Sequence, residues 1–316
     1  MKEHKKKWFW GVPVAVGVIV FITVLCLPVV GTDHKGCEPV EKNVEITAKL
    51  EAMRAEIEAG GYTFTVGWNP ALRYELKELC GFEQELELPG MYRIGSGENM
   101  TGIAKTSNTF PDAYIGYFTS IKNQEACGSA WAFGAVGLLE SMILKHDGIA
   151  VDLSEMYMVA CNPWGWGCNG GYWANDMLIF PGAAMEECAP YVFIDIPCFY
   201  YEACPTPYQI LDWEFVDGEY TVPSVEALKQ TILIYGAVQA AVYADDWFQA
   251  YTGGVFNKCK KNARYSNHII LLCGWDDEKG AWLLKNSWGT GWGEDGFMWI
   301  AYGCNRVGDG ANYFVY

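Results

Sequence analysis

The chain has 316 residues, of which 51% are hydrophobic and 19% charged, so it can bury a substantial core and is not of the disordered class. Its net charge of −16 disfavours nucleic acid as a partner. This acidity suits a basic or peptide ligand, although solubility alone also accounts for it.

The N-terminus combines basic residues with a long apolar run. Lysines crowd the first seven positions, and residues 8–31 carry no charge. The run exceeds the roughly 20 residues that cross a bilayer as a helix, whereas a cleavable signal usually has an apolar core of about 7–15 residues. Residues 1–31 are therefore predicted to be an uncleaved signal anchor that leaves the rest of the chain outside the cytoplasm. Cleavage of this segment as a signal peptide stays open as an alternative, because it ends in Pro28 and a short run up to Gly31.

Twelve cysteines accompany this leader, and nine of them lie between positions 127 and 304. A secretory leader with so many cysteines predicts an oxidising compartment and a disulfide framework, hence a secretory, lumenal or cell-surface location. The chain has no Cys-x-x-Cys pair and its four histidines are scattered, which argues against zinc. Neither a metal nor another cofactor is expected.

Two helices are predicted behind the leader. Apolar residues recur at helical spacing from Ile46 to Ile57, and two glycines follow at Gly60, so residues 41–59 are expected to form an amphipathic helix. A second, shorter helix is expected after Asn69, a capping residue that precedes a proline. Each helix has an apolar side that needs a partner surface.

The same part of the chain resembles a propeptide. Residues 62–69 read YTFTVGWN and residues 76–81 read LKELCG, which is similar to the short propeptide of cathepsin B-type proteases. In that family the propeptide lies through the active-site cleft and blocks it. The resemblance implies that residues 32–109, here called the prosegment, occupy a cleft of this chain. The Gly- and Ser-rich stretch that ends the prosegment suits an exposed linker.

Residues 124–133 read QEACGSAWAF and carry the most informative motif. The nucleophile segment of papain-like cysteine proteases reads C-G-[SA]-C-[WY], with a His and an Asn downstream. This stretch resembles that segment, but Ala130 stands where the second cysteine is expected. The apolar residues that follow predict a buried helix beginning at residue 130, where the helix N-terminus and a neighbouring imidazolium would favour a thiolate. Alanine offers neither a nucleophile nor a titratable group.

Three further blocks extend the resemblance to the papain family along the chain. The first, residues 167–173, reads GCNGGYW. The resemblance implies that Gly170 and Gly171 hydrogen-bond a substrate strand, and that Tyr172 and Trp173 border the pocket for its second side chain. Taken alone, the glycines indicate a turn and the aromatic residues a core.

The last two blocks supply the other candidate catalytic residues. His268 opens an apolar strand and follows Ala130 within the family's interval of about 130–150 residues. By resemblance His268 is the general base, Asn286 orients its ring, and Trp288 shields that hydrogen bond from water. Gln124 matches the glutamine that, with the N–H of residue 130, donates to the oxyanion.

The resemblance also implies disulfides. The family's pattern pairs Cys127 with Cys168, Cys161 with Cys198, and Cys259 with Cys304. Cys188 and Cys204 are left to pair with each other or to compete for Cys161. Cys273 lies in an apolar strand and is expected to be a buried free thiol.

Two departures from the family bear on function. Gln124-Glu125-Ala126 replaces the usual Gln-Gly-Ser, and the Asp-Trp-Arg usual near the mature start is absent. Cathepsin B trims dipeptides with the help of a histidine-bearing loop. Beyond the prosegment this chain has only His146, expected at the surface, and His268. An active form is therefore expected to be an endopeptidase.

Two accounts of Ala130 stay open. It is an engineered Cys-to-Ala trap in the precursor of a papain-like cysteine endopeptidase, or it marks a natural non-catalytic homologue that binds peptides or regulates proteolysis. A purely structural, membrane-tethered module would not need the four other candidate catalytic residues together. The expected partners are a peptide or protein substrate, the prosegment in the cleft, and a membrane through residues 1–31.

The expected fold is α+β and papain-like, with two lobes behind a mostly helical prosegment. The peptidase domain is predicted over residues 110–316. A helical lobe is expected over about 110–210, and an antiparallel, β-barrel-like lobe over about 211–316, with the cleft between them.

Overall fold

The computed structural model describes residues 40–83 and 109–316. The predicted signal anchor or signal peptide, residues 1–31, lies outside the described residues. In the two described ranges, no helix is long and apolar enough to cross a membrane. The described residues from 46 onward form one compact unit, so residues 46–83 of the prosegment belong to the same unit as residues 109–316.

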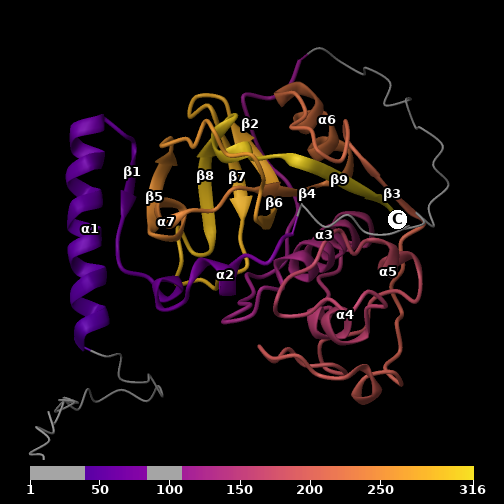
Figure 1. Ribbon diagram of the computed structural model, residues 1–316. Helices are drawn as coiled ribbons and strands as arrows, with labels where there is room; N and C mark the ends of the chain where they lie inside the picture. The colour runs from indigo at the N-terminus through magenta and orange to yellow at the C-terminus, as the bar shows by residue number, and fades with distance from the viewer. Residues whose placement is uncertain (1–39, 84–108) are drawn as a thin grey trace, which may run out of the picture. The chain divides into compact units, whose positions relative to one another are not determined.

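The helices of the described residues are mostly short, apart from two. The α-helices are α1 (Val40–Gly60), α2 (Leu76–Leu79), α3 (Ala130–Asp147), α4 (Glu155–Cys161), α5 (Asp176–Ile179), α6 (Val225–Tyr235) and α7 (Asp246–Gln249). Short 3-10 helices span Pro70–Arg73, Cys198–Tyr200 and Cys304–Arg306. Figure 1 shows α3, α4 and α5 grouped on one side of the molecule, with most strands on the other.

The strands join into one sheet. They are β1 (Phe64–Val66), β2 (Ala113–Ile115), β3 (Asp212–Phe215), β4 (Val238–Val242), β5 (Tyr251–Phe256), β6 (His268–Asp276), β7 (Ala281–Lys285), β8 (Phe297–Ala301) and β9 (Asp309–Val315). Their order is β1-β5-β8-β7-β6-β4-β9-β3, and β2 pairs with β6 off this path. All pairs are antiparallel except β5 with β8.

The sheet is open, which corrects part of the predicted fold. Its end strands, β1 and β3, each pair with a single neighbour, so the sheet does not close into the expected barrel. The two end strands come from distant parts of the chain. β1 belongs to the prosegment, and β3 follows the segment that contains α4 and α5. The predicted α+β class is confirmed.

Helix α3 begins at the predicted residue and lies close to the sheet. Every residue from Ala130 to Ile143 is buried. Glycine makes the close approach to β6 possible, because a Cβ added at Gly134 would come within 2.2 Å of Ile269 Cγ2. The helix ends at Gly148, which takes the left-handed φ of +71° that favours glycine.

Residues 40–83 of the prosegment are mostly helical, as predicted, but one predicted helix is interrupted. The expected helix over 41–59 forms as α1, but the helix expected after Asn69 is broken. The Asn69 side chain caps the 3-10 helix Pro70–Arg73, then the backbone extends at Tyr74, and a capping box starts α2 afresh. The strand β1 was not predicted, although the alternating burial of its three residues matches the period of a strand.

Candidate active site

Ala130 opens α3 and is fully buried. The first N–H groups of a helix have no partner within the helix and give its N-terminus a partial positive charge. A thiolate at this position would be stabilised by that charge, whereas a methyl group cannot ionise. The position therefore has the electrostatic surroundings of a nucleophile without the reactive group.

The sheet brings His268 next to Asn286. His268 is the first residue of β6 and Asn286 follows the last residue of β7, and because these strands are antiparallel the two ends meet. Asn286 Oδ1 lies 2.7 Å from His268 Nε2 and accepts the ring N–H in the tautomer that carries hydrogen there. The ring of Trp288 lies 4.8 Å from the imidazole, centroid to centroid, and all three side chains are buried.

Gln124 connects the segment before α3 to the segment after β7. Its backbone N–H donates to Ser287 O at 2.9 Å, and its Oε1 accepts from Ser287 Oγ at 2.6 Å. Its side-chain Nε2, the donor expected to bind an oxyanion, donates to Cys127 O at 2.7 Å. An amide nitrogen carries two hydrogens, so this bond leaves one donor of Gln124 for a ligand.

The prosegment crosses these residues as a non-helical segment that forms one parallel β-bridge, Phe82 with Gly171. Glu83 N–H donates to Gly171 O at 3.0 Å, and Gly171 N–H donates to Gly81 O at 2.9 Å. On the other side, Phe82 N–H donates to Asn267 O at 3.1 Å. The segment is thus bonded both to the glycine loop near α4 and to the start of β6.

The ring of Phe82 lies where the resemblance predicts a substrate side chain. It stacks on Tyr172 at 5.3 Å between centroids, with 6° between the planes, and lies 4.8 Å from the ring of Trp173. Gly170 also approaches the prosegment, because an added Cβ would lie 3.1 Å from Gly81 O. All four predicted substrate-binding residues therefore contact or approach this segment.

Two consecutive prosegment residues link the start of α3 with His268. The backbone of Cys80 lies close enough to the imidazole to affect its pKa. Gly81 packs so tightly that an added Cβ would fall 1.9 Å from Gly128 O, two residues before Ala130. Neighbouring Cα atoms are about 3.8 Å apart, so His268 and Gly128, just before α3, both lie beside this short piece of the prosegment.

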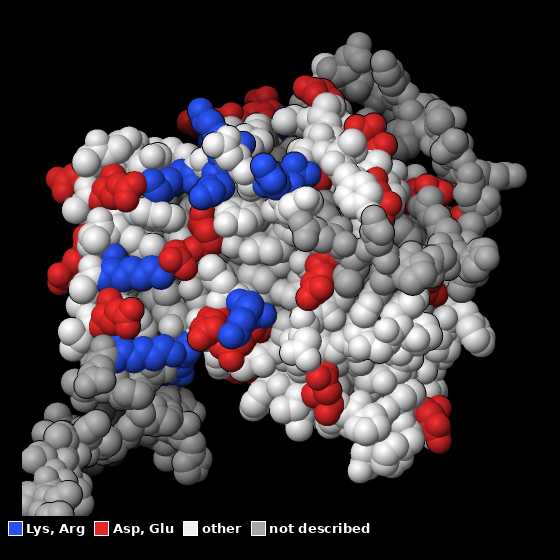
Figure 2. All heavy atoms as spheres, viewed as in Figure 1, with Lys and Arg blue, Asp and Glu red and all other residues white. Residues whose placement is uncertain are grey.

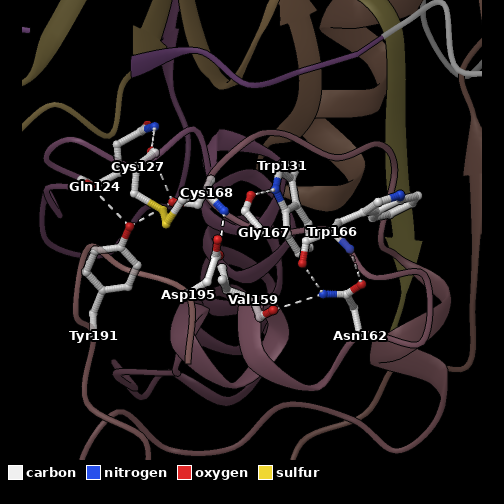
Figure 3. Close-up of a disulfide and its surroundings, with 11 residues drawn as sticks. Gln124, Cys127, Trp131, Val159, Asn162, Trp166, Gly167, Cys168, Tyr191 and Asp195 are labelled. Atoms are coloured by element: carbon white, nitrogen blue, oxygen red, sulfur yellow. Dashed lines mark hydrogen bonds between the residues drawn. A yellow bond between two sulfur atoms is a disulfide. The ribbon is translucent and has the colours of Figure 1, made fainter. Parts of the chain in front are cut away.

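A disulfide fixes the glycine loop to the segment before α3. Figure 3 shows the bond between Cys127 and Cys168 with the surrounding hydrogen bonds. Asp195 Oδ1 accepts from Cys168 N–H at 2.7 Å, and the Tyr191 hydroxyl donates to Gln124 O at 3.0 Å. These contacts hold the loop before α3 in place from the helical side.

Three other disulfides lie within the described residues: Cys161–Cys198, Cys188–Cys204 and Cys259–Cys304. Cys188 and Cys204, for which the sequence left two alternatives, pair with each other. Cys273 is a buried free thiol, as is Cys80 of the prosegment. Within the described ranges, no group of three or more His, Cys, Asp or Glu side chains is arranged to hold a metal ion.

Burial controls the charge of His268. It lowers the pKa of the imidazole to about 4, and the hydrogen bond to Asn286 and the backbone of Cys80 oppose the shift only in part. Nδ1 has no hydrogen-bond partner among the described residues. The ring is therefore neutral near pH 7 while the prosegment covers it, and uncovering it should return its pKa toward about 6.5.

Acidification is expected to destabilise the closed chain through His268. The pKa of about 4 in the folded chain lies below that of the unfolded chain, so the unfolded state takes the proton first as the pH falls. This contribution to stability is full above about pH 6.5 and is lost between about pH 6.5 and 4. We expect His268→Gln to remove roughly 2–3 kcal/mol of the decrease in unfolding free energy between about pH 7 and 4.5. Urea unfolding of the unchanged chain and of His268→Gln at the two pH values measures both decreases. Equal decreases in the two proteins would refute this expectation.

A buried ionic cluster beneath the site was missed in the sequence. Lys122 Nζ lies 2.8 Å from Glu140 Oε1 and 3.0 Å from Glu155 Oε1. Burial raises the pKa of Glu155, and the nearby Lys122 ammonium opposes that shift. Lys122 and both glutamates line the same cavity as Asn286. One indication of this cluster was present in the sequence: Glu140 is a single charged residue inside the otherwise apolar run of α3.

Charge is distributed unequally around the site. The sequence has no lysine or arginine between Lys145 and Lys229. On the face drawn in Figure 2, the region around α4 accordingly shows Asp and Glu side chains without basic neighbours. A basic or neutral peptide would meet no repulsion from this side.

Comparisons with known sequences identify related proteins. The family model described as "Papain family cysteine protease" matches residues 111–315. Gamete and mating-type specific protein A of Dictyostelium discoideum is 36% identical over 193 residues, which are 59% of this chain and 41% of that protein. The chain thus spans less than half the length of this relative.

Two solved insect structures resemble the fold. Digestive procathepsin L2 proteinase from the larval midgut of Tenebrio molitor is 26% identical, with a TM-score of 0.74, over 89% of this chain and 96% of that one. Digestive procathepsin L 3 of the same organ is 23% identical, with a TM-score of 0.72, over 89% and 95%. Both are precursors, and their likeness confirms the predicted fold.

Proposed function

The chain belongs to the papain family of cysteine proteases, and from this premise we propose that it is the precursor of an endopeptidase that is inactive as it stands. The carrying observation is the hydrogen bond of 2.7 Å between His268 and Asn286, opposite a helix N-terminus where Ala130 takes the nucleophile's place. Such a constellation serves thiol chemistry, and only the thiol is missing.

Each remaining group has a role once a thiol is present. His268 would take the thiol proton and later protonate the leaving amine, while Asn286 holds the ring in place. The free N–H of Gln124 and the backbone N–H of residue 130 would donate to the developing oxyanion. Without sulfur, no covalent step can begin.

Peptide binding without cleavage is the second candidate function. The observation in its favour is the prosegment itself, which is bonded at Gly171 and Asn267 and buries Phe82 without any reactive group at residue 130. A natural alanine would suit this function, and an engineered Cys-to-Ala trap would suit the first. A purely structural module explains neither the paired His268 and Asn286 nor the bonded segment.

Restoring the thiol tests the proposal. After removal of the prosegment, the Ala130→Cys variant must gain cleavage of an unfolded protein that the unchanged chain, treated in the same way, lacks. If the variant binds peptides in the cleft yet cleaves none, peptide binding is the better description.

We also propose that the protein works outside the cytoplasm. The four disulfides support an oxidising compartment. Attachment to a membrane through residues 1–31 rests on the sequence alone. A peptide or protein substrate and the prosegment remain the proposed partners.

A further inference from the structure

Glu125 has an unusual backbone for a residue with a side chain. Its φ is +51°, in the left-handed region that favours glycine, which is the residue the family usually has at this position. The side chain of Asn123 stabilises this conformation, since Oδ1 accepts from Glu125 N–H at 3.2 Å and Nδ2 donates to Glu125 Oε1 at 2.7 Å. A strained non-glycine residue next to Gln124 suggests that its side chain has a use.

The second carboxylate oxygen of Glu125 binds the prosegment. Glu125 Oε2 accepts a hydrogen bond from the hydroxyl of Tyr74, which belongs to the prosegment. Burial, and then Glu125 itself, raise the pKa of Tyr74 to about 12, so the phenol stays a donor near neutral pH. With one oxygen held by Asn123, the other is aimed at the prosegment.

The contact between Tyr74 and Glu125 is separate from the contacts that the prosegment makes with the glycine loop. The prosegment passes Glu125 at Tyr74, crosses Gly128 at Gly81, and reaches Gly171 at Phe82. Tyr74 also lies in the extended break between the 3-10 helix and α2, so its side chain is presented to the cleft by a non-helical backbone.

We propose that Glu125 is a peptide-recognition residue that binds a tyrosine hydroxyl, and that Tyr74 of the prosegment is its resident ligand. The proposal rests on the proposed function in one respect, that the cleft's occupant is a peptide. It explains why this chain carries glutamate where glycine would be less strained. It also predicts that the prosegment is held at two separate places, Glu125 and Gly171.

Amide hydrogen exchange of the full-length chain tests the contact. The N–H groups of Phe82 and Glu83 are bonded across the cleft, so their protection reports how often the prosegment leaves it. We expect Tyr74→Phe to speed their exchange roughly 10- to 100-fold, the usual range for losing a hydrogen bond to a charged group. The matched control is Tyr302→Phe, which loses a hydroxyl bonded to Asp277 Oδ1 at 2.8 Å, just beyond the ends of β8 and β6. It should leave the exchange of both amides unchanged.

A second variant separates recognition from local folding. Glu125→Gly relieves the strained backbone, so the exchange of β6 and β7 amides should not speed up, whereas the amides of Phe82 and Glu83 should speed up as in Tyr74→Phe. The double variant should exchange no faster than either single one, because both remove the same bond.

The outcomes are distinguishable. If both amides are protected in the unchanged chain but Tyr74→Phe behaves like Tyr302→Phe, or if the two substitutions add, this inference is wrong and the proposed function is untouched. If the amides of Phe82 and Glu83 exchange freely in the unchanged chain, the prosegment does not occupy the cleft and both fail.

Discussion

Replacing Ala130 by cysteine is expected to turn an inert chain into one that cleaves unfolded protein. The new thiol would stand at the N-terminus of α3 and face His268, whose ring Asn286 already holds. Both neighbours favour the thiolate. Removing the nucleophile of a hydrolase costs roughly 10⁶-fold in kcat, so restoring it should raise the rate from background by several orders of magnitude. The assay is release of fragments from an unfolded protein after limited digestion has removed the prosegment.

Three controls make this result specific. The unchanged chain, digested in the same way, should stay inactive. The double variant Ala130→Cys with His268→Gln should lose most of the gain, since the base is missing. Internal fragments, rather than dipeptides, should appear, because the described cleft has no second histidine. If the restored thiol neither cleaves protein nor reacts with a thiol-directed peptide inhibitor, the remaining residues are not placed for catalysis.

Replacing Gly81 by alanine is expected to expel the prosegment from the cleft. Gly81 has a φ of +72°, and an added Cβ would lie 1.9 Å from Gly128 O and 2.4 Å from Gly128 C. Both obstacles are backbone, which cannot move aside as a side chain can. Phe82 would then leave its place on Tyr172 and become open to proteolysis. We expect cleavage after Phe82 by an added protease with aromatic preference to speed up more than about 100-fold, because such cleavage follows the population of the open state.

Gly61 supplies the matched control in the same segment. Its φ is +64°, so alanine there meets the same backbone strain, but an added Cβ would have no atom within 4 Å. Gly61→Ala should cost about 1 kcal/mol and change cleavage after Phe82 only a few-fold. If Gly81→Ala is cut no faster than Gly61→Ala, the segment does not need its close contact with Gly128.

Features that depend on contiguous residues could be predicted from the sequence. The start of α3 at Ala130 follows from a motif in which the loop, the helix start and the apolar run are contiguous. The neighbourhood of His268 and Asn286 came from resemblance, and the register of β6 with β7 supplies its physical basis. The pairing of Cys188 with Cys204 needed the structure, because spacing alone left a competitor.

Features that depend on two distant segments could not be predicted. The expected helix is interrupted at Tyr74, whose hydroxyl is bonded to Glu125, and neither residue signals the other in the sequence. Lys122 and Glu140 look like solvated charges until the fold buries them together. The open sheet likewise depends on which strands end up at its edges.

Residue 130 occupies a site whose neighbours should favour a thiolate, and the pKa of a thiol restored at this position reports their influence. The measurement is the pH dependence of alkylation at position 130 of the Ala130→Cys variant after removal of the prosegment, followed by mass spectrometry of the labelled peptide. We predict a pKa well below the usual value of about 8.5, and a return toward that value when His268→Gln is added. A pKa at or above about 8.5 in both proteins would contradict the claim, because the helix N-terminus and His268 would then exert no influence on the residue between them.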